Sequence, residues 1–298
     1  MYQLLTENLN AIDSIKHNDN SIVLSSLREF YQPVRSQGFA IKYVIDGVER
    51  YTLNGSQYPI ETGKYLLTNC ANEGHVEIES RNHVKGICIN IVPEMLAEVV
   101  ASISRPDTAF TDVALGQFFS SALFLENCYD ANQTKLGEML LRLQRAIQND
   151  TYQHEDFTTA FFYTISEQIV ADQIPIFKQL QAIPSIKSVT KKELYKRVLR
   201  GKEYMDALFA NPLTIKLVAT EACMSEYHFF RLFKAIFKQT PNQYIIEKRL
   251  KYAQALLQKD RTAVSTAAIE AGFSDIYSFS KAFKSYFGYS PSYFLKHN

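Results

Sequence analysis

The chain has 298 residues, of which 46% are hydrophobic and 21% are charged, a composition typical of a soluble globular protein with about two domains. No apolar run approaches the roughly 20 residues of a membrane-spanning helix, and residues 1–20 are too polar for a secretory signal. Cys70, Cys88, Cys128 and Cys223 are too scattered for a metal site or a disulfide framework. We therefore expect a cytoplasmic protein with reduced thiols and no membrane partner.

The net charge of +1 conceals two halves of opposite sign. Residues 190–298 hold 18 basic and 9 acidic residues, a net charge of +9, and residues 1–189 hold 14 basic and 22 acidic ones, a net charge of −8. This asymmetry is typical of a nucleic-acid-binding portion joined to a portion with another role. Basic surface alone is weak evidence, because it is also an ordinary solvated face.

Residues 22–92 have the pattern of a β-rich domain. Asp46-Gly47 and Asn54-Gly55 are typical hairpin turns, and Gly63 continues their spacing. The predicted strands, short and rich in aromatic and β-branched residues, are 40–45, 50–53, 58–60, 65–67, 76–79 and 86–91. Short strands with evenly spaced turns predict a small barrel or sandwich.

After Pro93 the apolar residues recur at helical intervals. One predicted helical face comprises Leu115, Phe118, Phe119, Ala122 and Leu123, and another comprises Leu136, Leu140, Leu143 and Ile147. A further helix is predicted from residue 157 to about residue 180, with Pro175 as a candidate break. Residues 182–189 are the predicted linker between a domain at 1–185 and a helical domain at 190–298.

A segment of the basic half repeats at an interval of 50 residues. The matched pairs include Tyr227 with Tyr277, Phe229 with Phe279, Arg231 with Lys281, Phe233-Lys234 with Phe283-Lys284, and Thr240-Pro241 with Ser290-Pro291. The same interval aligns residues 219–222 with residues 269–272. Two copies are too few for a solenoid, which needs about three repeats, so we interpret the repeat as a small helical module used twice.

In the first copy, Leu217, Val218 and Ala222 predict a short helix, Cys223-Met224 a turn, and Ser225 the N-cap of a second helix. The second helix has a predicted core stripe of Phe229, Leu232, Phe233 and Ile236. Its predicted outer face comprises Glu226, Tyr227, Phe230, Arg231 and Lys234. A tight turn followed by a helix with a basic and aromatic outer face is typical of a helix-turn-helix.

The second copy repeats this pattern. Ala267, Ala268 and Ala271 predict the first helix, Gly272 the turn and Ser274 the N-cap. The predicted core stripe comprises Phe279, Ala282, Phe283 and Tyr286, and the predicted outer face comprises Ile276, Tyr277, Ser280, Lys281 and Lys284.

Residues 242–257, without Gly or Pro, predict a connecting helix of about 16 residues, roughly 24 Å long. Such a helix could place the two modules in two successive major grooves of double-stranded DNA, about 34 Å apart.

Over residues 190–298 the chain resembles the AraC/XylS family of transcription regulators. The resemblance is carried by Ala271-Gly272-Phe273-Ser274-Asp275, by Phe279-Ser280-Lys281-Ala282-Phe283-Lys284, by Phe287-Gly288 and by Ser290-Pro291. It implies that bases and phosphates contact the outer faces of both second helices, at Tyr227, Phe230, Arg231, Ile276, Tyr277, Ser280 and Lys281. RNA polymerase is a further candidate partner.

Different roles are predicted along these faces. Arg231 is the leading candidate for base readout, because a guanidinium can bind guanine O6 and N7 together, and Lys281 holds the same place in the second copy. Lys234 and Lys284 lie further along their helices and are predicted to contact phosphate.

The apolar and aromatic positions leave alternatives open. Phe230 and Ile276 either contact thymine methyl groups or are simply exposed apolar side chains. Tyr227 contacts a base or the DNA backbone in one interpretation and packs on its own domain in the other.

The acidic half resembles, more weakly, the cupin-like regulatory domain of the same regulators. Metal-dependent cupins use two His and a Glu, followed by another His, whereas only His75 and His83 occur here, near Glu73, Glu77 and Glu79. No metal or cofactor is therefore predicted. Tyr43, Tyr51, Tyr58 and Tyr65 are candidates for lining a ligand cavity, although core packing is favoured, and no effector-binding residue is assigned. For the stripe at 136–147, packing on the barrel is favoured over a dimer seam.

The sequence thus predicts a two-domain α+β protein, with an N-terminal cupin-like β-barrel followed by helices and a C-terminal all-α domain of two helix-turn-helix motifs joined by a linker helix. The predicted function is a sequence-specific DNA-binding transcription regulator, not an enzyme, controlled through its N-terminal domain by an unidentified ligand. The alternative is an N-terminal domain that binds another protein, and a homodimer is a candidate state. A cupin-type metalloenzyme or a zinc-dependent DNA-repair protein would need ligand sets that the sequence does not offer.

Overall fold

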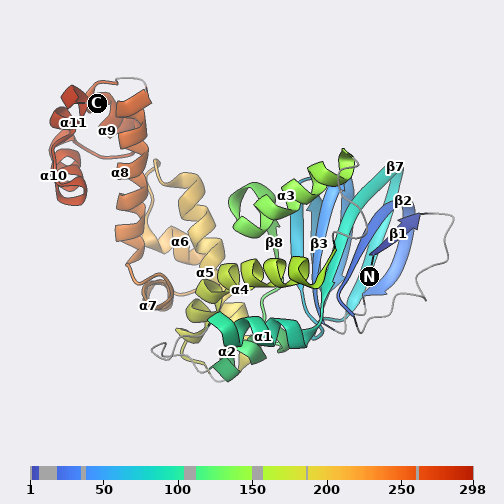
Figure 1. Ribbon diagram of the computed structural model, residues 1–298. Helices are drawn as coiled ribbons and strands as arrows, with labels where there is room; N and C mark the ends of the chain where they lie inside the picture. The colour runs from blue at the N-terminus through green and yellow to red at the C-terminus, as the bar shows by residue number, and fades with distance from the viewer. Residues whose placement is uncertain are drawn as a thin grey trace. The chain divides into compact units, whose positions relative to one another are not determined.

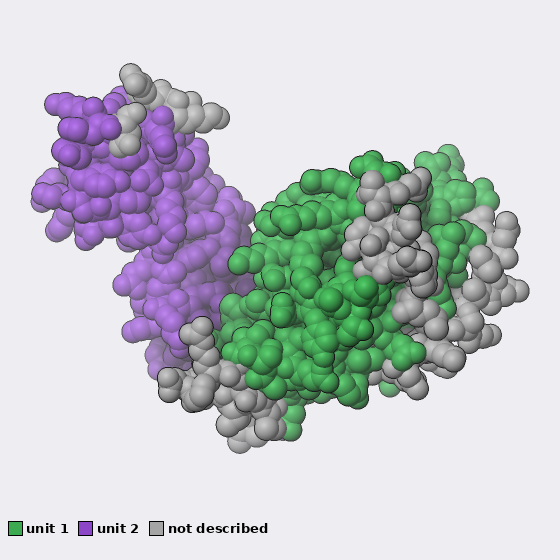
Figure 2. Space-filling view, viewed as in Figure 1, with its two compact units in different colours: residues 1–178 green, residues 179–298 purple. Residues whose placement is uncertain are grey.

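A computed structural model describes residues 2–6, 19–34, 38–103, 112–149, 157–185, 187–259 and 262–297. The chain divides into two compact units, unit 1 (Met1–Lys178) and unit 2 (Gln179–Asn298) (Figure 1; Figure 2). Unit 1 combines a sheet with helices, and the described part of unit 2 is helical. The predicted α+β class is therefore confirmed, while most of the polar stretch 1–20 lies outside the described residues.

Unit 1 is built on one eight-stranded sheet. Its strands are β1 (Tyr2–Thr6), β2 (Ser21–Val34), β3 (Phe39–Asp46), β4 (Val48–Leu53), β5 (Ser56–Glu61), β6 (Lys64–Thr68), β7 (Gly74–Ile91) and β8 (Asn127–Asp130). The main path runs β1-β2-β7-β3-β6-β8, and β4 lies off this path, paired with both β5 and β7. Among the described strands, β1 and β8 end the path without pairing to each other. The predicted β-rich domain is thus an open sheet and not a closed barrel.

The glycine-containing turns lie where the sequence predicts them. Gly47, Gly55 and Gly63 have φ values of 93°, 78° and 77°, in the left-handed region that only glycine adopts readily. By contrast, the two predicted strands at 76–79 and 86–91 are parts of one long strand, β7. Both ends of the polar stretch pair with β2, Glu79 with Glu29 and Val84 with Leu27, and the register shifts between them. Residues 80–83 thus bridge two paired segments of one strand.

Unit 1 also contains helices α1 (Pro93–Ile103), α2 (Asp112–Ser120), α3 (Lys135–Gln148) and the first part of α4 (Thr159–Gln181), with a 3₁₀ turn at Ala131–Gln133. The prediction that the first of the two helical faces extends through Leu123 is wrong, because α2 ends at Ser120. The chain leaves the helix there, so that Phe124 packs edge-on against Phe39, with 5.0 Å between ring centroids. Helix α4 continues through Pro175 without a break.

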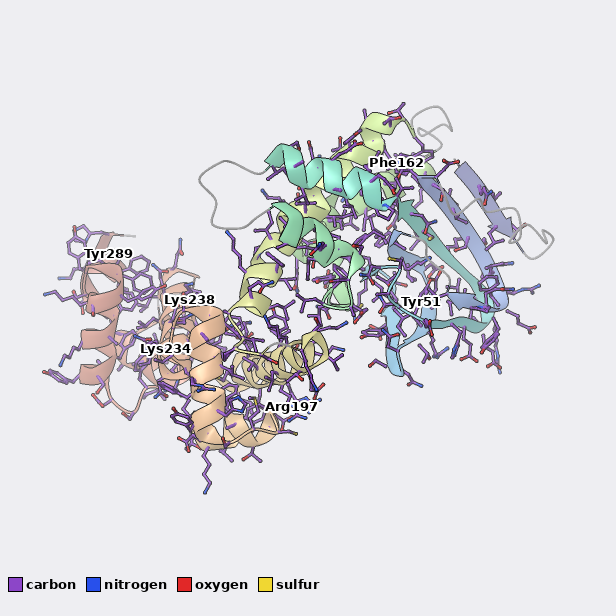
Figure 3. All side chains as sticks on the ribbon, turned by 90° about the horizontal axis from the view of Figure 1, so that it is seen from below. Tyr51, Phe162, Arg197, Lys234, Lys238 and Tyr289 are labelled. Atoms are coloured by element: carbon purple, nitrogen blue, oxygen red, sulfur yellow. The ribbon has the colours of Figure 1, made fainter. Side chains whose placement is uncertain are left out.

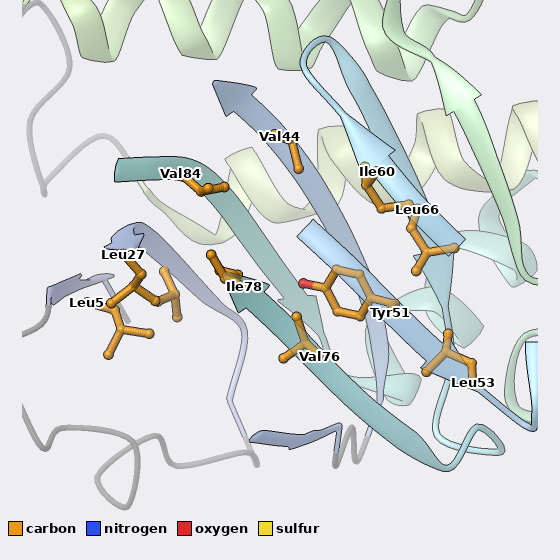
Figure 4. Packing of buried hydrophobic residues seen from close by; sticks show 11 residues of the cluster. Leu5, Leu27, Val44, Tyr51, Leu53, Ile60, Leu66, Val76, Ile78 and Val84 are labelled. Carbon is orange, nitrogen blue, oxygen red and sulfur yellow. The ribbon is translucent and has the colours of Figure 1, made fainter. Parts of the chain in front are cut away.

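The two faces of the sheet bury different side chains, as the alternation along a strand requires. One face carries an apolar cluster that includes Val44, Tyr51 and Leu66 (Figure 4). On the other face, the Tyr43 hydroxyl donates to Gln144, and the Tyr65 hydroxyl lies 2.7 Å from Thr134 Oγ1. These two contacts tie the sheet to α3 and the residue before it.

Several predictions about side chains in unit 1 can be compared with their burial. Tyr43, Tyr51 and Tyr65 are buried, which confirms core packing for three of the four predicted tyrosines; Tyr58 is half-buried. Leu136, Leu140 and Leu143 are buried within the chain, so this stripe packs inside unit 1, as favoured. In the described ranges, no three His, Cys, Asp or Glu side chains gather as a metal site, and no helix has the length and apolar character to span a bilayer.

The described part of unit 2 begins within α4 and continues through seven helices. These are α5 (Ser188–Leu208), α6 (Ile215–Glu221), α7 (Glu226–Phe237), α8 (Pro241–Lys259), α9 (Val264–Glu270), α10 (Ile276–Phe287) and α11 (Pro291–His297). Helices α5, α6 and α7 contact one another, and α9, α10 and α11 pack on α8. The predicted connecting helix is therefore present as α8, with 19 residues and roughly 28 Å of length.

Candidate nucleic-acid interface

Both copies of the repeat fold as a helix, a tight turn and a second helix. In the first copy the turn follows α6, with Cys223 N–H donating to Thr220 O at 2.9 Å and Met224 N–H donating to Ala219 O at 2.9 Å. In the second copy Gly272 and Phe273 donate in the same way to Ile269 O and Ala268 O, at 2.9 and 3.0 Å. This pair of bonds satisfies carbonyl groups at the end of a helix and requires a left-handed residue. Cys223 and Gly272 supply it, with φ values of 51° and 84°.

The N-caps of the second helices differ from the prediction in one copy. Ser225 caps α7 as predicted, accepting the His228 N–H at 3.3 Å. Asp275, not Ser274, caps α10, and its Oδ1 accepts the Ser278 N–H at 2.7 Å. The Ser274 hydroxyl instead donates to Asp275 Oδ2 at 3.1 Å. The prediction of Ser274 is therefore wrong, because a carboxylate one residue later satisfies the helix N-terminus.

The predicted alignment of the first helices is also wrong by one residue. Helix α9 begins at Val264, 49 residues after Ile215 begins α6, whereas α10 begins at Ile276, 50 residues after Glu226 begins α7. The second turn therefore contains one extra residue. Burial supports this register, because Ala219 and Ala268 are both buried while Ile269 is 72% exposed.

The core stripe of α7 is confirmed, and that of α10 is confirmed in part. Phe229, Leu232, Phe233 and Ile236 are all buried on α7. On α10, Phe279 and Phe283 are buried and Ala282 is half-buried, whereas Tyr286 is 45% exposed. The Tyr286 hydroxyl donates to Glu247 Oε1 on α8 at 3.1 Å, so this side chain leaves the core for a polar partner.

The structure places the predicted DNA-contacting side chains on the outer faces of α7 and α10. Tyr227 and Tyr277 occupy matching positions and are each 75% exposed. The other exposed members are Phe230, Arg231 and Lys234 on α7 and Ile276, Lys281 and Lys284 on α10, while Ser280 is half-buried. The structure thus brings these residues together as two groups, one on each second helix.

Polar contacts between α5 and α8 fix the helix that joins the two modules. Asp206 on α5 accepts hydrogen bonds from the Tyr244 hydroxyl at 2.5 Å and from Lys202 Nζ and Lys248 Nζ, each at 2.8 Å. Burial raises the pKa of Asp206, but these hydrogen bonds outweigh it and leave the pKa below its ordinary value. Arg249 adds hydrogen bonds to Phe209 O at 2.6 Å and to Asn211 O at 2.9 Å.

A second contact joins α8 to α10. Glu247 Oε1 accepts from Lys251 Nζ at 2.5 Å as well as from Tyr286. The hydrogen bond from Lys251 holds the pKa of Glu247 below its usual value. Because Tyr244, Lys248 and Glu247 all lie on α8, one helix carries the polar anchors of both modules.

Three cations near the first module were not singled out from the sequence. Lys238 follows α7 with a left-handed φ of 58°, and Figure 3 labels it together with Lys234. Arg197, also labelled there, donates to Cys223 O at 3.4 Å, and Arg200 donates to Cys223 Sγ at 3.7 Å. Lys238 aligns with Gly288, so the comparison of the two copies gives no basic residue shared at this position. Arg197 and Arg200 lie on α5, outside the repeat. Folding brings these two arginines beside the turn at Cys223.

Each of the two units contains a segment that matches a known protein family. A family described as a helix-turn-helix domain matches residues 218–297, and a family described as an AraC-like ligand-binding domain matches residues 26–157. The Msm operon regulatory protein of Streptococcus mutans is 32% identical over 95 residues, covering 32% of this chain and 34% of that protein. The transcriptional regulator ArgR of Pseudomonas aeruginosa is 28% identical over 127 residues, covering 43% and 38% respectively. The chain thus matches about a third of the length of these relatives.

Solved structures that resemble this chain include two bacterial proteins. An AraC-type regulator from Chromobacterium violaceum is 25% identical and covers 34% of this chain and 91% of its own, with a TM-score of 0.33. ToxT from Vibrio cholerae, bound to an unsaturated fatty acid, is 11% identical and covers 93% and 96%, with a TM-score of 0.35. From the family matches, the chain carries an AraC-like ligand-binding domain and an AraC-type helix-turn-helix domain, and its homologues are transcriptional regulators. The resemblance to the AraC/XylS family is confirmed.

Proposed function

We propose that this protein is a sequence-specific DNA-binding transcription regulator of the AraC type. The observation that carries the proposal is the pair of helix-turn-helix modules on α8, each with an exposed aromatic and basic face on its second helix. The net charge of +9 over residues 190–298 supports a polyanionic partner. We also propose that this segment is a domain that folds and binds DNA alone, and that residues 1–185 form the regulatory domain.

Different side chains on the exposed faces would contact bases and phosphates. Arg231 and Lys281 would read base edges, since both occupy the same outer position of their helices. Lys234 and Lys284, one helical turn further on, would neutralise phosphate. Tyr227 and Tyr277 are exposed enough to reach a base or the DNA backbone.

Three further outer positions are uncharged. Phe230 and Ile276 would contact thymine methyl groups, the favourable partner for an exposed apolar side chain in a major groove. Ser280 takes the place of Phe230 in the second copy and offers a hydroxyl to a base or a phosphate. The two recognition helices would enter successive major grooves of one duplex, with α8 setting their separation.

The N-terminal unit would control this binding without chemistry of its own. A ligand or partner protein that binds unit 1 would shift the population of chain arrangements competent for DNA. We therefore propose a regulator and not an enzyme, acting in the bacterial cytoplasm where its DNA is found. A homodimer and a contact with RNA polymerase belong to the same proposal.

The test is selection of binding sites from random duplexes with the full-length protein, followed by footprinting at physiological salt. The proposal expects two short motifs about one helical turn, roughly 34 Å, apart on one face of the duplex. Arg231→Ala together with Lys281→Ala should relax the preference at one base pair in each half of the site, whereas Lys296→Ala, at an exposed cation on α11, should leave the motifs unchanged. Equal binding of all sequences by full-length protein and by residues 190–298 would overturn the proposal.

A second experiment distinguishes regulation by a small molecule from regulation by a protein partner of unit 1. Thermal unfolding of the full chain is measured with a panel of metabolites and, in parallel, with any protein that co-purifies from the cell. A stability shift with one metabolite supports a small-molecule sensor, because a ligand stabilises the state to which it binds. A shift with the co-purified protein alone supports the protein-interaction alternative.

A further inference from the structure

A lysine amine and a cysteine thiol contact each other in the middle of the unit 1 sheet. Lys42 Nζ lies 2.8 Å from Cys88 Sγ, and the two residues are direct partners on the antiparallel strands β3 and β7. Direct partners on neighbouring strands project from the same face of a sheet, with α-carbons roughly 4.5–5.5 Å apart. The backbone ladder therefore holds the amine and the sulfur together without any rearrangement of the strands.

The neighbours of this pair include apolar and polar side chains: Cys88 Sγ also donates to Asn90 Oδ1 at 3.6 Å, and the buried Glu49 interacts electrostatically with Lys42. Reading across five strands, the row is Val23, Cys88, Lys42, Leu66 and Cys128. Val23 and Leu66 belong to the apolar cluster, and the sulfur of Cys88 packs against it, on the face that Figure 4 shows. Lys42 and Cys88 are both half-buried.

No second thiol is within reach of Cys88 in this row. Cys128 is three strand intervals away, roughly 14 Å at about 4.8 Å per interval. A disulfide needs α-carbons within about 7 Å of each other. The amine of Lys42, 2.8 Å from Cys88 Sγ, is a nucleophile already in contact with the sulfur that would be oxidised.

We propose that Lys42 and Cys88 form a modification site at which a peroxide produces a covalent nitrogen–sulfur link between β3 and β7. In the first step the Cys88 thiolate attacks hydrogen peroxide, which forms a sulfur–oxygen bond, breaks the oxygen–oxygen bond and releases hydroxide. The sulfur is oxidised to a sulfenic acid and the peroxide is reduced. Lys42 then loses its ammonium proton to water, and the free amine attacks the sulfur. A nitrogen–sulfur bond forms, the sulfur–oxygen bond breaks, and the hydroxyl leaves as water with a proton from the nitrogen.

The product is a sulfenamide of the kind that a sulfenic acid forms with a backbone nitrogen. The flexible four-carbon stem of lysine allows the nitrogen to close the remaining gap to the sulfur. The link would join two strands of the regulatory unit that no disulfide in this row can join. This site is independent of the DNA-binding proposal, since it concerns unit 1 chemistry alone.

The test uses the reduced full-length protein, treated with hydrogen peroxide, alkylated after unfolding, digested with trypsin and analysed by mass spectrometry. The expected product is one cross-linked peptide pair that contains Lys42 and Cys88 and is lighter than the two peptides by two hydrogen atoms. Trypsin should no longer cleave after Lys42, Cys88 should resist alkylation, and dithiothreitol should restore both. Protein unfolded in urea before peroxide should give no link, because the sheet no longer holds the pair together.

Two variants provide the matched controls. Lys42→Arg keeps the positive charge but removes the nucleophilic amine, so the link should vanish and Cys88 should become trappable by dimedone as a sulfenic acid. Cys128→Ala removes another half-buried thiol of the same face and should leave the link in place. Folding of each variant is checked by circular dichroism. Dimedone trapping of Cys88 in the folded wild-type protein to the same extent as in Lys42→Arg, or a Cys88–Cys128 disulfide, would overturn the proposal.

Discussion

The two helix-turn-helix modules share a plan but differ in how they carry it out. Both end their first helix with the same pair of backbone hydrogen bonds around a left-handed residue. The first module uses Cys223 there and caps α7 with a neutral serine, whereas the second uses Gly272, adds one residue and caps α10 with the carboxylate of Asp275. The comparison teaches that hydrogen-bond requirements at helix ends are kept while turn length and residue type vary.

A second difference concerns how deeply each recognition helix is anchored. Ile236 of α7 is 3% exposed, whereas Tyr286, its counterpart on α10, is 45% exposed and bonds to Glu247. The first module therefore holds its second helix with four apolar residues, and the second module replaces one of them by a surface hydrogen bond. Positions 236 and 286, which are 50 residues apart, thus stabilise their helices differently: Ile236 by apolar burial and Tyr286 by a surface hydrogen bond.

The largest expected effect tests this difference in anchoring. Ile236→Ala should lower the free energy of unfolding by about 2–5 kcal/mol, because it leaves a cavity in a packed core. Tyr286→Ala should cost about 1 kcal/mol or less, because it removes an exposed ring and one hydrogen bond. Urea unfolding of the full chain, with hydrogen exchange along α7 and α10 to localise the loss, measures both. Equal losses would contradict the different burial of the two positions.

The left-handed turn residues give the next contrast. Gly272→Ala should cost at least about 1–3 kcal/mol from backbone strain, and a β-carbon there would lie 2.3 Å from Ala210 O. Cys223→Gly relieves a strained residue but adds freedom to the unfolded chain, worth about 0.4–1 kcal/mol, so its net effect should be small. Thermal unfolding of the two variants checks the ranking. A Cys223→Gly variant as unstable as Gly272→Ala would show that the cysteine side chain stabilises its turn.

Base readout should also differ between the modules. Arg231→Ala should weaken specific binding by about 1–3 kcal/mol and relax the preference at one base pair of its half of the site. Lys281→Ala should cost less, since lysine lacks the planar fork of arginine. Fluorescence anisotropy with a set of singly substituted duplexes measures both effects.

A phosphate contact serves as the matched control for that experiment. Lys284→Ala should weaken binding to every duplex alike and reduce the slope of affinity against salt concentration by about one. A uniform loss from Arg231→Ala as well would assign this residue to phosphate and remove the proposed difference between the two kinds of cation.

The smallest expected effect is a local response to acid. The backbone hydrogen bond from Ser278 holds the pKa of Asp275 below its usual value. A carboxyl with a lowered pKa in the folded state stabilises that state above its unfolded pKa of about 3.9, and the contribution is lost as the pH falls through the folded value. Ser225, the other cap, does not titrate over this range.

Amide exchange of Ser278 and His228 between about pH 5 and pH 2 measures this difference, because both N–H groups donate to the caps. Exchange at Ser278, corrected for its intrinsic rate, should accelerate toward low pH relative to His228. Asp275→Ser should make the two amides respond alike. A response at Ser278 that survives this substitution would assign the acid effect to another group.

The helical unit was largely predictable because its signals are local. Phe229 and Phe233 recur at helical spacing on one side, and Arg231 and Lys234 recur on the other, so periodicity alone separates the buried face from the exposed one. The N-cap of α10 was not predictable in this way. Ser274 and Asp275 are both good N-caps, and the choice depends on which side chain faces the Ser278 N–H after the turn closes.

The β-rich unit shows where such local signals end. Gly47 and Gly55 mark turns by themselves, because few other residues adopt a positive φ. Both segments of β7 pair with β2, which is distant in sequence, and the short strand β8 (Asn127–Asp130) pairs with β6. The contact between Lys42 and Cys88, 46 residues apart, has the same origin.

By itself, the sequence determined the division of charge, the turn positions, the duplicated modules and the side chains that face outward on α7 and α10. Each of these follows from residue type and spacing within one helix or one turn. Tertiary structure alone decided that the sheet stays open, that Tyr286 leaves the core for Glu247, and that Lys42 meets Cys88. These features depend on which distant segments pair or pack, and pairing energies between distant segments leave no periodic pattern along the chain.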